Sequence, residues 1–142
     1  MMSKEEFREF RQECGNYFFY VSRLAGLRDR HREIYNRMSG VSSIPMDRIS
    51  SGTKTSSVRS DTRILNYLEQ KDSVEQEIAY YSEKIASIVS TIDGIPDPPL
   101  RPMVWMALVQ GKTIDETAQI YGMKTATVRR RINSQFIEEN NS

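Results

Sequence analysis

Apolar residues recur every three or four positions through residues 5–38, which predicts one helix of about nine turns with a single apolar seam. The seam begins with Phe7, Phe10, Cys14, Tyr17, Val21 and Leu24. It then continues either through Arg28, His31, Tyr35 and Met38, or along the more apolar route of Leu27, His31, Ile34 and Met38. Gly15 and Gly26 each cost about 1 kcal/mol against alanine in a helix, so we expect them to mark a close helix approach or a bend.

A second segment with the same spacing runs from about residue 60 to residue 92. Ser60 and Asp61 are favourable N-cap residues, and Gly94 ends the pattern. The seam positions are Ile64, Tyr67, Lys71, Val74, Ile78, Tyr81, Ile85, Ile88 and Ile92. We interpret the polar seam residues His31 and Lys71 as structural or snorkelling side chains rather than as ligands.

Between the two segments, residues 39–60 are rich in serine and carry few large apolar side chains, which is typical of a flexible loop. Two helices of similar length joined by a loop predict an antiparallel hairpin over residues 1–93. The apolar stripes of a lone hairpin would leave much apolar surface in water. We therefore expect this region to form at least a homodimer or a higher homo-oligomer.

The segment 94–99 holds three prolines in four residues, which cannot continue a helix, so it predicts a domain boundary. A short apolar helix should begin between Pro99 and Pro102 and end at residues 109–110, before Gly111. The predicted fold is therefore all-α: a long, coiled-coil-like hairpin followed by a small C-terminal domain over residues 97–137, with a disordered tail at 138–142.

Residues 112–135 carry the signature of a helix-turn-helix. Thr113 and Glu116 form a capping-box pattern, which predicts a helix from Ile114. Ala118 suits a close helix crossing, and Gly122 suits a tight turn with a left-handed backbone angle. Thr125 is expected to cap the second helix.

On that second helix Val128 and Ile132 lie one turn apart and should point inward together. The outward side would then carry arginine, threonine and amide side chains able to contact phosphates and base edges in the major groove. The predicted reading helix is 126–135. The predicted DNA-binding residues are Lys124, Thr125, Ala126, Thr127, Arg129, Arg130, Arg131, Asn133 and Ser134.

The stretch from Gly111 to Ile132, GKTIDETAQIYGMKTATVRRRI, resembles the C-terminal DNA-binding unit of sigma-factor region 4. The whole layout is similar to the small bacteriophage regulators of the RinA and ArpU kind. This resemblance implies a DNA-binding activator of late phage genes, acting in the bacterial host cytoplasm. The resemblance also makes host RNA polymerase a candidate partner, and it leaves open whether the polymerase is contacted. Nothing resembles the polymerase-binding region 2 of a full sigma factor.

Composition narrows the remaining classes of function. With one cysteine and one histidine in 142 residues, the chain can form neither an internal disulfide nor a Cys/His zinc site. The sequence has no Gly-rich phosphate loop, no nucleophile elbow and no His-Glu-x-x-His motif, so we expect no enzyme activity, no catalytic residues, no cofactor and no metal. It also lacks a long apolar run or a secretion signal, so we expect a cytoplasmic protein with no membrane partner.

Formal charge is uneven along the chain. Residues 61–100 hold 3 basic and 8 acidic side chains, while residues 101–142 hold 6 basic and 4 acidic ones. A near-neutral protein can therefore present a basic contact surface.

The leading hypothesis is a sequence-specific regulator that binds double-stranded DNA. One alternative is a phage small terminase subunit that recognises packaging DNA. Another is a coiled-coil adaptor or anti-repressor that does not bind DNA, in which the C-terminal motif is only a folded cap.

Overall fold

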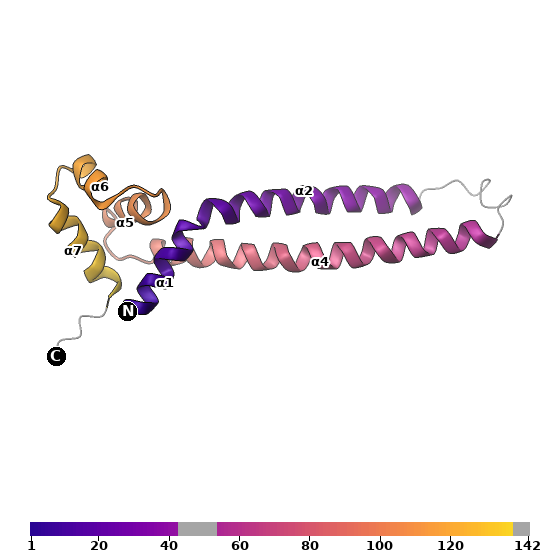
Figure 1. Cartoon of the computed structure of the whole chain (residues 1–142), viewed down its shortest axis with the longest axis horizontal. Helices are drawn as coiled ribbons and strands as arrows, with labels where there is room; N and C mark the ends of the chain where they lie inside the picture. Colours follow the sequence, from indigo (N-terminus) through magenta and orange to yellow (C-terminus); the bar gives the residue numbers. More distant parts are fainter. Residues whose placement is uncertain (43–53, 138–142) are drawn as a thin grey trace. The chain divides into compact units, whose positions relative to one another are not determined.

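The computed structural model of the chain (Figure 1) describes the backbone of residues 1–42 and 54–137 and the side chains of residues 1–40 and 62–137. Across these ranges the secondary structure is helical apart from one isolated bridge between Met2 and Ile137, which confirms the all-α prediction. The helices are α1 (Lys4–Gly15), α2 (Tyr17–Ser42), α4 (Lys54–Asp93), α5 (Leu100–Val104), the π-helical turn η1 (Trp105–Val109), α6 (Ile114–Tyr121) and α7 (Thr125–Phe136).

The loop predicted over residues 39–60 is shorter than expected, because both of its ends are helical. Helix α2 continues to Ser42 and α4 already begins at Lys54. The expected start at residues 60–61 was wrong, since a favourable cap contributes only about 1 kcal/mol and does not prevent a helix from starting earlier. Residues 43–53, and with them the predicted flexibility of the loop centre, lie outside the described residues, as does the predicted tail at 138–142.

The single N-terminal helix expected over residues 5–38 is interrupted at Asn16. This residue ends α1 with φ −95° and ψ 4°, and α2 begins at the next position. Gly15 has no neighbouring atom within 4 Å of an added Cβ, so it marks the bend and not a close approach. Side chains span the break: the Tyr20 hydroxyl donates a 2.6 Å hydrogen bond to Glu13, which also pairs with Lys84 at 3.2 Å. These contacts compensate for two residues with poor helix propensity.

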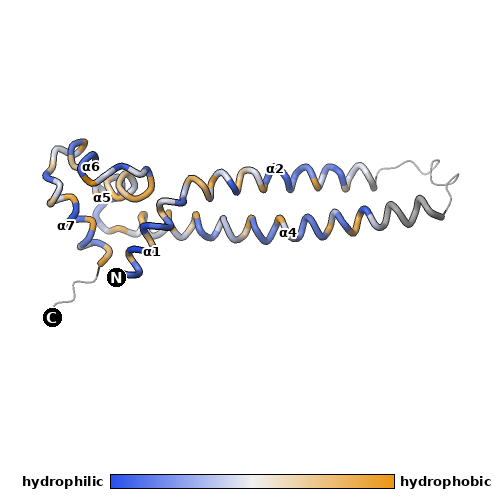
Figure 2. Tube along the Cα trace, viewed as in Figure 1, coloured by the Kyte–Doolittle hydropathy of each residue, from blue (hydrophilic) through white to orange (hydrophobic). Residues whose placement is uncertain are grey.

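The described residues between Ser22 and Ser82 form one compact unit, in which α2 and α4 run antiparallel (Figure 1). Its core consists of Leu27, Ile34 and Val74, with Met38, Tyr67, Ile78 and Tyr81 packed partly buried against it. Apolar positions recur along α4 between hydrophilic ones (Figure 2). The seam therefore follows the more apolar route through Leu27 and Ile34, while Tyr35 of the other route is exposed.

The two polar seam residues, His31 and Lys71, both pair with the carboxylate of Glu75. Glu75 Oε1 lies 3.0 Å from His31 Nε2 and 3.0 Å from Lys71 Nζ. The hydrogen bond from His31, and then that from Lys71, lower the pKa of Glu75 below its ordinary value. Both residues thus pair within the hairpin, as their interpretation as structural side chains requires.

The second compact unit combines residues 1–21 with the described residues from Glu83 to Ile137. Its N- and C-terminal segments meet at Phe136, whose ring centroid lies 5.3 Å from that of Phe7 and 5.3 Å from that of Phe10. The backbone N–H of Met2 also donates to the carbonyl of Phe136 at 2.7 Å. This division differs from the boundary predicted in the segment 94–99, because Phe7 and Phe10 pack on Phe136 of the C-terminal helix.

None of the helices in the described part of the chain has both the length and the apolar character needed to cross a membrane.

We expect Phe7→Ala to destabilise the unit that contains α1 and α7. Phe7 is buried and stacked on Phe136, and truncating a buried phenylalanine costs about 3–5 kcal/mol of unfolding free energy. Thermal unfolding followed by circular dichroism measures the loss. The exposed neighbour Gln12 provides the control, since Gln12→Ala should change stability by about 0.5 kcal/mol or less. Equal melting temperatures for the two variants would contradict the packing.

Candidate nucleic-acid interface

A short apolar segment supports the helix-turn-helix. Helix α5 continues directly into η1, and Met103, Val104, Leu108 and Val109 of this segment are buried. Trp105 is partly buried and packs edge-on against Tyr17, with ring centroids 4.9 Å apart. The segment ends at Val109, and Gly111 two residues later has a φ of 73°, which only glycine adopts easily. The predicted start and end of this helix are confirmed.

Helix α6 begins as the capping box predicts. The Thr113 hydroxyl accepts from the Glu116 N–H at 3.0 Å, and the Glu116 carboxylate accepts from the Thr113 N–H at 3.2 Å. One turn later the buried Thr117 donates its hydroxyl proton to the Thr113 carbonyl at 2.9 Å, so this polar side chain is paired. The hydrogen bonds of Thr113 with Glu116 and Thr117 thus stabilise the start of α6.

The turn between α6 and α7 depends on Gly122, which has φ 64° and ψ 32°. In this left-handed conformation the Gly122 N–H donates to Gln119 and the Met123 N–H donates to Ala118, at 3.3 and 2.9 Å. These two bonds satisfy the last carbonyls of α6 in a Schellman arrangement. The buried Ala118 sits where the sequence predicted a close crossing.

Burial of one edge of α7 sets its rotation. Val128, Ile132 and Phe136 are buried, with Val128 fully inaccessible to solvent. The remaining circumference of the helix therefore faces outward, as the spacing of Val128 and Ile132 predicts. Of the predicted DNA-binding residues, six are exposed: Lys124, Ala126, Arg129, Arg130, Arg131 and Ser134. Thr125, Thr127 and Asn133 are partly buried.

Thr125 does not have the predicted capping role. The N-cap of α7 is Lys124, which makes no side-chain capping bond, and Thr125 is the first residue of the helix. The Thr125 hydroxyl instead donates to Asp115 Oδ1 at 2.8 Å and so ties the start of α7 to the first turn of α6. The expectation was wrong because a side chain on a neighbouring helix offers Thr125 a partner that the local sequence does not reveal.

Helix α7 carries three consecutive exposed arginines. Arg129, Arg130 and Arg131 make no ion pair with any residue in the ranges 1–40 and 62–137. Ser134, by contrast, uses its hydroxyl proton for the Arg131 carbonyl at 3.1 Å. The outer surface of α7 is therefore strongly cationic and rich in free hydrogen-bond donors, which suits phosphates and guanine edges.

A small cavity links α7 to the N-terminal helix. It has a volume of about 260 Å³ and is lined by residues of α1, η1, α6 and α7, including Arg11, Arg129 and Asn133. Arg11 is not among the predicted site residues, because the heptad spacing of residues 5–38 predicted that α1 belongs to the oligomerisation region. The available signal was the sorting of charge around residues 4–13, where basic and acidic side chains occupy different sides of the helix.

The one cysteine of the chain, Cys14, is buried in this unit. Burial, and then the neighbouring charge of Glu13, raise the pKa of the Cys14 thiol to about 12, so this group stays protonated near neutral pH. No group of three or more His, Cys, Asp or Glu in the described ranges could hold a metal ion.

Val128→Asp should unfold the domain around α7, since it would bury an unpaired carboxylate at a position with no solvent access. Such a change costs several kcal/mol of unfolding free energy. Ser134→Asp is the matched control, because it places the same charge on the exposed side and should leave the fold intact. Circular dichroism melting of both variants tests this expectation, and an unaltered transition for Val128→Asp would show that the face is not inward.

No protein-family model matches the chain, and neither a curated protein nor a solved structure matches it. The similarity to sigma-factor region 4 and to the RinA and ArpU regulators stays a prediction from the motif and the order of segments.

Proposed function

We propose that the chain is a sequence-specific transcriptional regulator that binds double-stranded DNA and reads the major groove with residues 126–135 of α7. One observation carries this proposal. The rotation of α7 leaves three consecutive arginines outside and unpaired among the described residues, on the second helix of a tight helix-turn-helix. In proteins of this architecture the second helix lies in the major groove, with its N-terminal residues on base edges.

The outward residues divide by the contacts that they can make. Arg130 lies opposite the buried edge and can fork onto guanine O6 and N7. Arg129 and Arg131 flank it and suit phosphates on either side of the groove. Thr125 is held by Asp115 and is better suited to positioning α7 than to direct contact. No catalytic step is required.

The two alternative readings explain fewer of these features. A protein-binding adaptor would use the motif only as a folded cap, and an unpaired cationic face on α7 would then have no purpose. A small terminase subunit would share the DNA contact but assemble as a ring of many subunits. The resemblance to phage regulators favours an activator of late genes acting in a bacterial cytoplasm, with host RNA polymerase as a further partner to be tested.

We also propose that residues 22–82 assemble the protein as a homodimer. Among the described side chains of this unit, the buried apolar residues are Leu24, Leu27, Ile34 and Val74, which is a thin core for two long helices. Leu65 and Leu68 lie one turn apart on α4 and are 60% and 38% exposed, and Tyr35 on α2 is 59% exposed. A second copy would cover these residues. It would also supply a second α7, so that two half-sites spaced by one helical turn or a multiple could be read.

Arg130→Ala should weaken binding to a preferred duplex by about 5- to 150-fold, which corresponds to 1–3 kcal/mol, and should reduce the difference between preferred and unrelated sequences. The preferred duplex is obtained by selection from a random library at a stated salt concentration. Fluorescence anisotropy with both duplexes then measures the two affinities.

Arg32→Ala serves as the control, because it removes an exposed arginine from the hairpin and should leave the preference for sequence unchanged. The proposal fails if the wild-type protein selects no motif and binds no duplex. Equal weakening on every sequence would instead restrict Arg130 to phosphate contact.

The double variant Leu65→Glu with Leu68→Glu should convert the dimer into a monomer, because it puts charges on the apolar surface that a second copy covers. Sedimentation at micromolar concentration gives the mass. Gln70→Glu adds charge to the same helix without removing apolar surface and should leave the dimer intact. A wild-type monomer would contradict the dimer, and a mass of many subunits would favour the terminase reading.

A further inference from the structure

Helix α1 sorts its side chains into three faces. At about 100° per residue, one face carries the buried Phe7 and Cys14. A second face carries acidic side chains, namely Glu5, Glu6, Glu9 and Glu13. Lys4, Arg8 and Arg11 form the third, and we call these three residues the basic face of α1. All three are exposed.

The basic face has no anionic partner in the described part of the chain. None of its three residues forms an ion pair there, although carboxylates lie on the same helix. Arg11 rests its guanidinium group over the ring of Phe7, 5.8 Å from the centroid. Lys4 and Arg8 are four residues apart, and like charges at that spacing destabilise a helix by a few tenths of a kcal/mol. A bound anion would relieve this repulsion.

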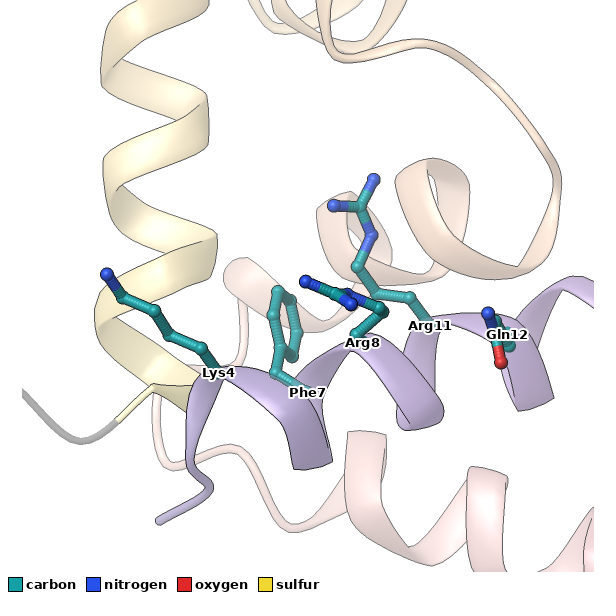
Figure 3. A pocket seen from close by; sticks show the side chains of 5 residues that line it. All are labelled: Lys4, Phe7, Arg8, Arg11 and Gln12. Carbon is teal, nitrogen blue, oxygen red and sulfur yellow. The ribbon is translucent and has the colours of Figure 1, made fainter.

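Figure 3 shows Lys4 at the end of α1 that lies next to α7, with Arg8 and Arg11 following along α1. Lys4 is in the first turn of α1, two residues after Met2, whose N–H is bonded to the carbonyl of Phe136 in α7. Farther along α1, Arg11 lines the cavity of about 260 Å³ together with Arg129 and Asn133 of α7. The cations of α1 thus continue the cationic surface of α7 on the flank that carries Arg129.

We propose that the basic face of α1 is a second part of the DNA interface, in which Lys4, Arg8 and Arg11 bind backbone phosphates beside the groove that α7 enters. This inference rests on the proposed function. Seven residues of helix span roughly 10 Å, about three base-pair steps of 3.4 Å, so the three cations can follow one strand. Phosphate contacts carry no sequence information, and they hold the register of the reading helix. Phe7 and Phe136 keep α1 attached to that helix.

The test compares the wild-type protein with the triple variant Lys4→Gln, Arg8→Gln, Arg11→Gln. Affinities are measured on the selected duplex and on an unrelated duplex, each at several salt concentrations. The variant should lose on the order of ten- to a hundredfold in affinity on both duplexes and keep the ratio between them. The slope of log K against log salt should become shallower by up to about 3, since each phosphate contact contributes about 0.9.

The control is the triple variant Arg28→Gln, Arg30→Gln, Arg32→Gln, which removes the same charge from the exposed surface of α2. Its salt slope should equal that of the wild-type protein. Melting curves check that both triple variants fold. If the α1 triple variant unfolds, Arg8→Gln alone should lower the slope by about 1.

Failure of this inference is separable from failure of the proposed function. If Arg130→Ala weakens binding but the α1 triple variant has wild-type affinity and slope, the basic face does not touch DNA and the reading helix acts alone. A change in preferred sequence caused by the α1 variant would also overturn the phosphate role. If the wild-type protein binds no duplex, both proposals fall. Binding to an acidic polypeptide that is lost only in the α1 variant would then assign the face to a protein partner.

Discussion

Burial of Val128, Ile132 and Phe136 along one edge of α7 is the constraint on which the other features of the interface depend. It determines which way the helix is turned, and therefore which side chains solvent or a ligand can reach. The edge is covered from two directions. The helix-turn-helix encloses Val128, whereas the rings of Phe7 and Phe10 cover Phe136. A helix held at both ends in this way presents its arginines in one orientation, and pre-organisation of this kind lowers the cost of ordering them on binding.

Local patterns in the sequence were sufficient to predict the parts of the fold whose partners lie nearby. The capping box at Thr113, the left-handed turn at Gly122 and the inward pair of Val128 and Ile132 each involve residues within a few positions of one another. The seam of α4 was also predicted at every position, since each of its members is at least partly buried. The outward side of α7 follows from the same periodicity, so most of the candidate site could be read from the spacing.

The features that the sequence did not reveal depend on distant partners. Phe7 fits a heptad seam as well as any residue of the N-terminal segment, yet its partner is Phe136, at the other end of the described chain. Helix α1 ends at Asn16, and Tyr20 and Lys84 both bind the Glu13 carboxylate near this break. Periodicity identifies a buried face but not what covers it. For this reason the basic face of α1 was first assigned to oligomerisation.

The pairing of Met2 with Ile137 has a consequence for the order of events during synthesis. Domains generally fold as units while the chain emerges from the ribosome. The unit that contains α1 and α7, however, combines residues 1–21 with residues that follow Ser82. Phe7 and Phe10 are made before α7 and stay without the Phe136 ring until α7 has been translated. The surface proposed to bind DNA is therefore completed only after α7 has been made, and a chain that stopped before α7 would carry the helical hairpin without its reading helix.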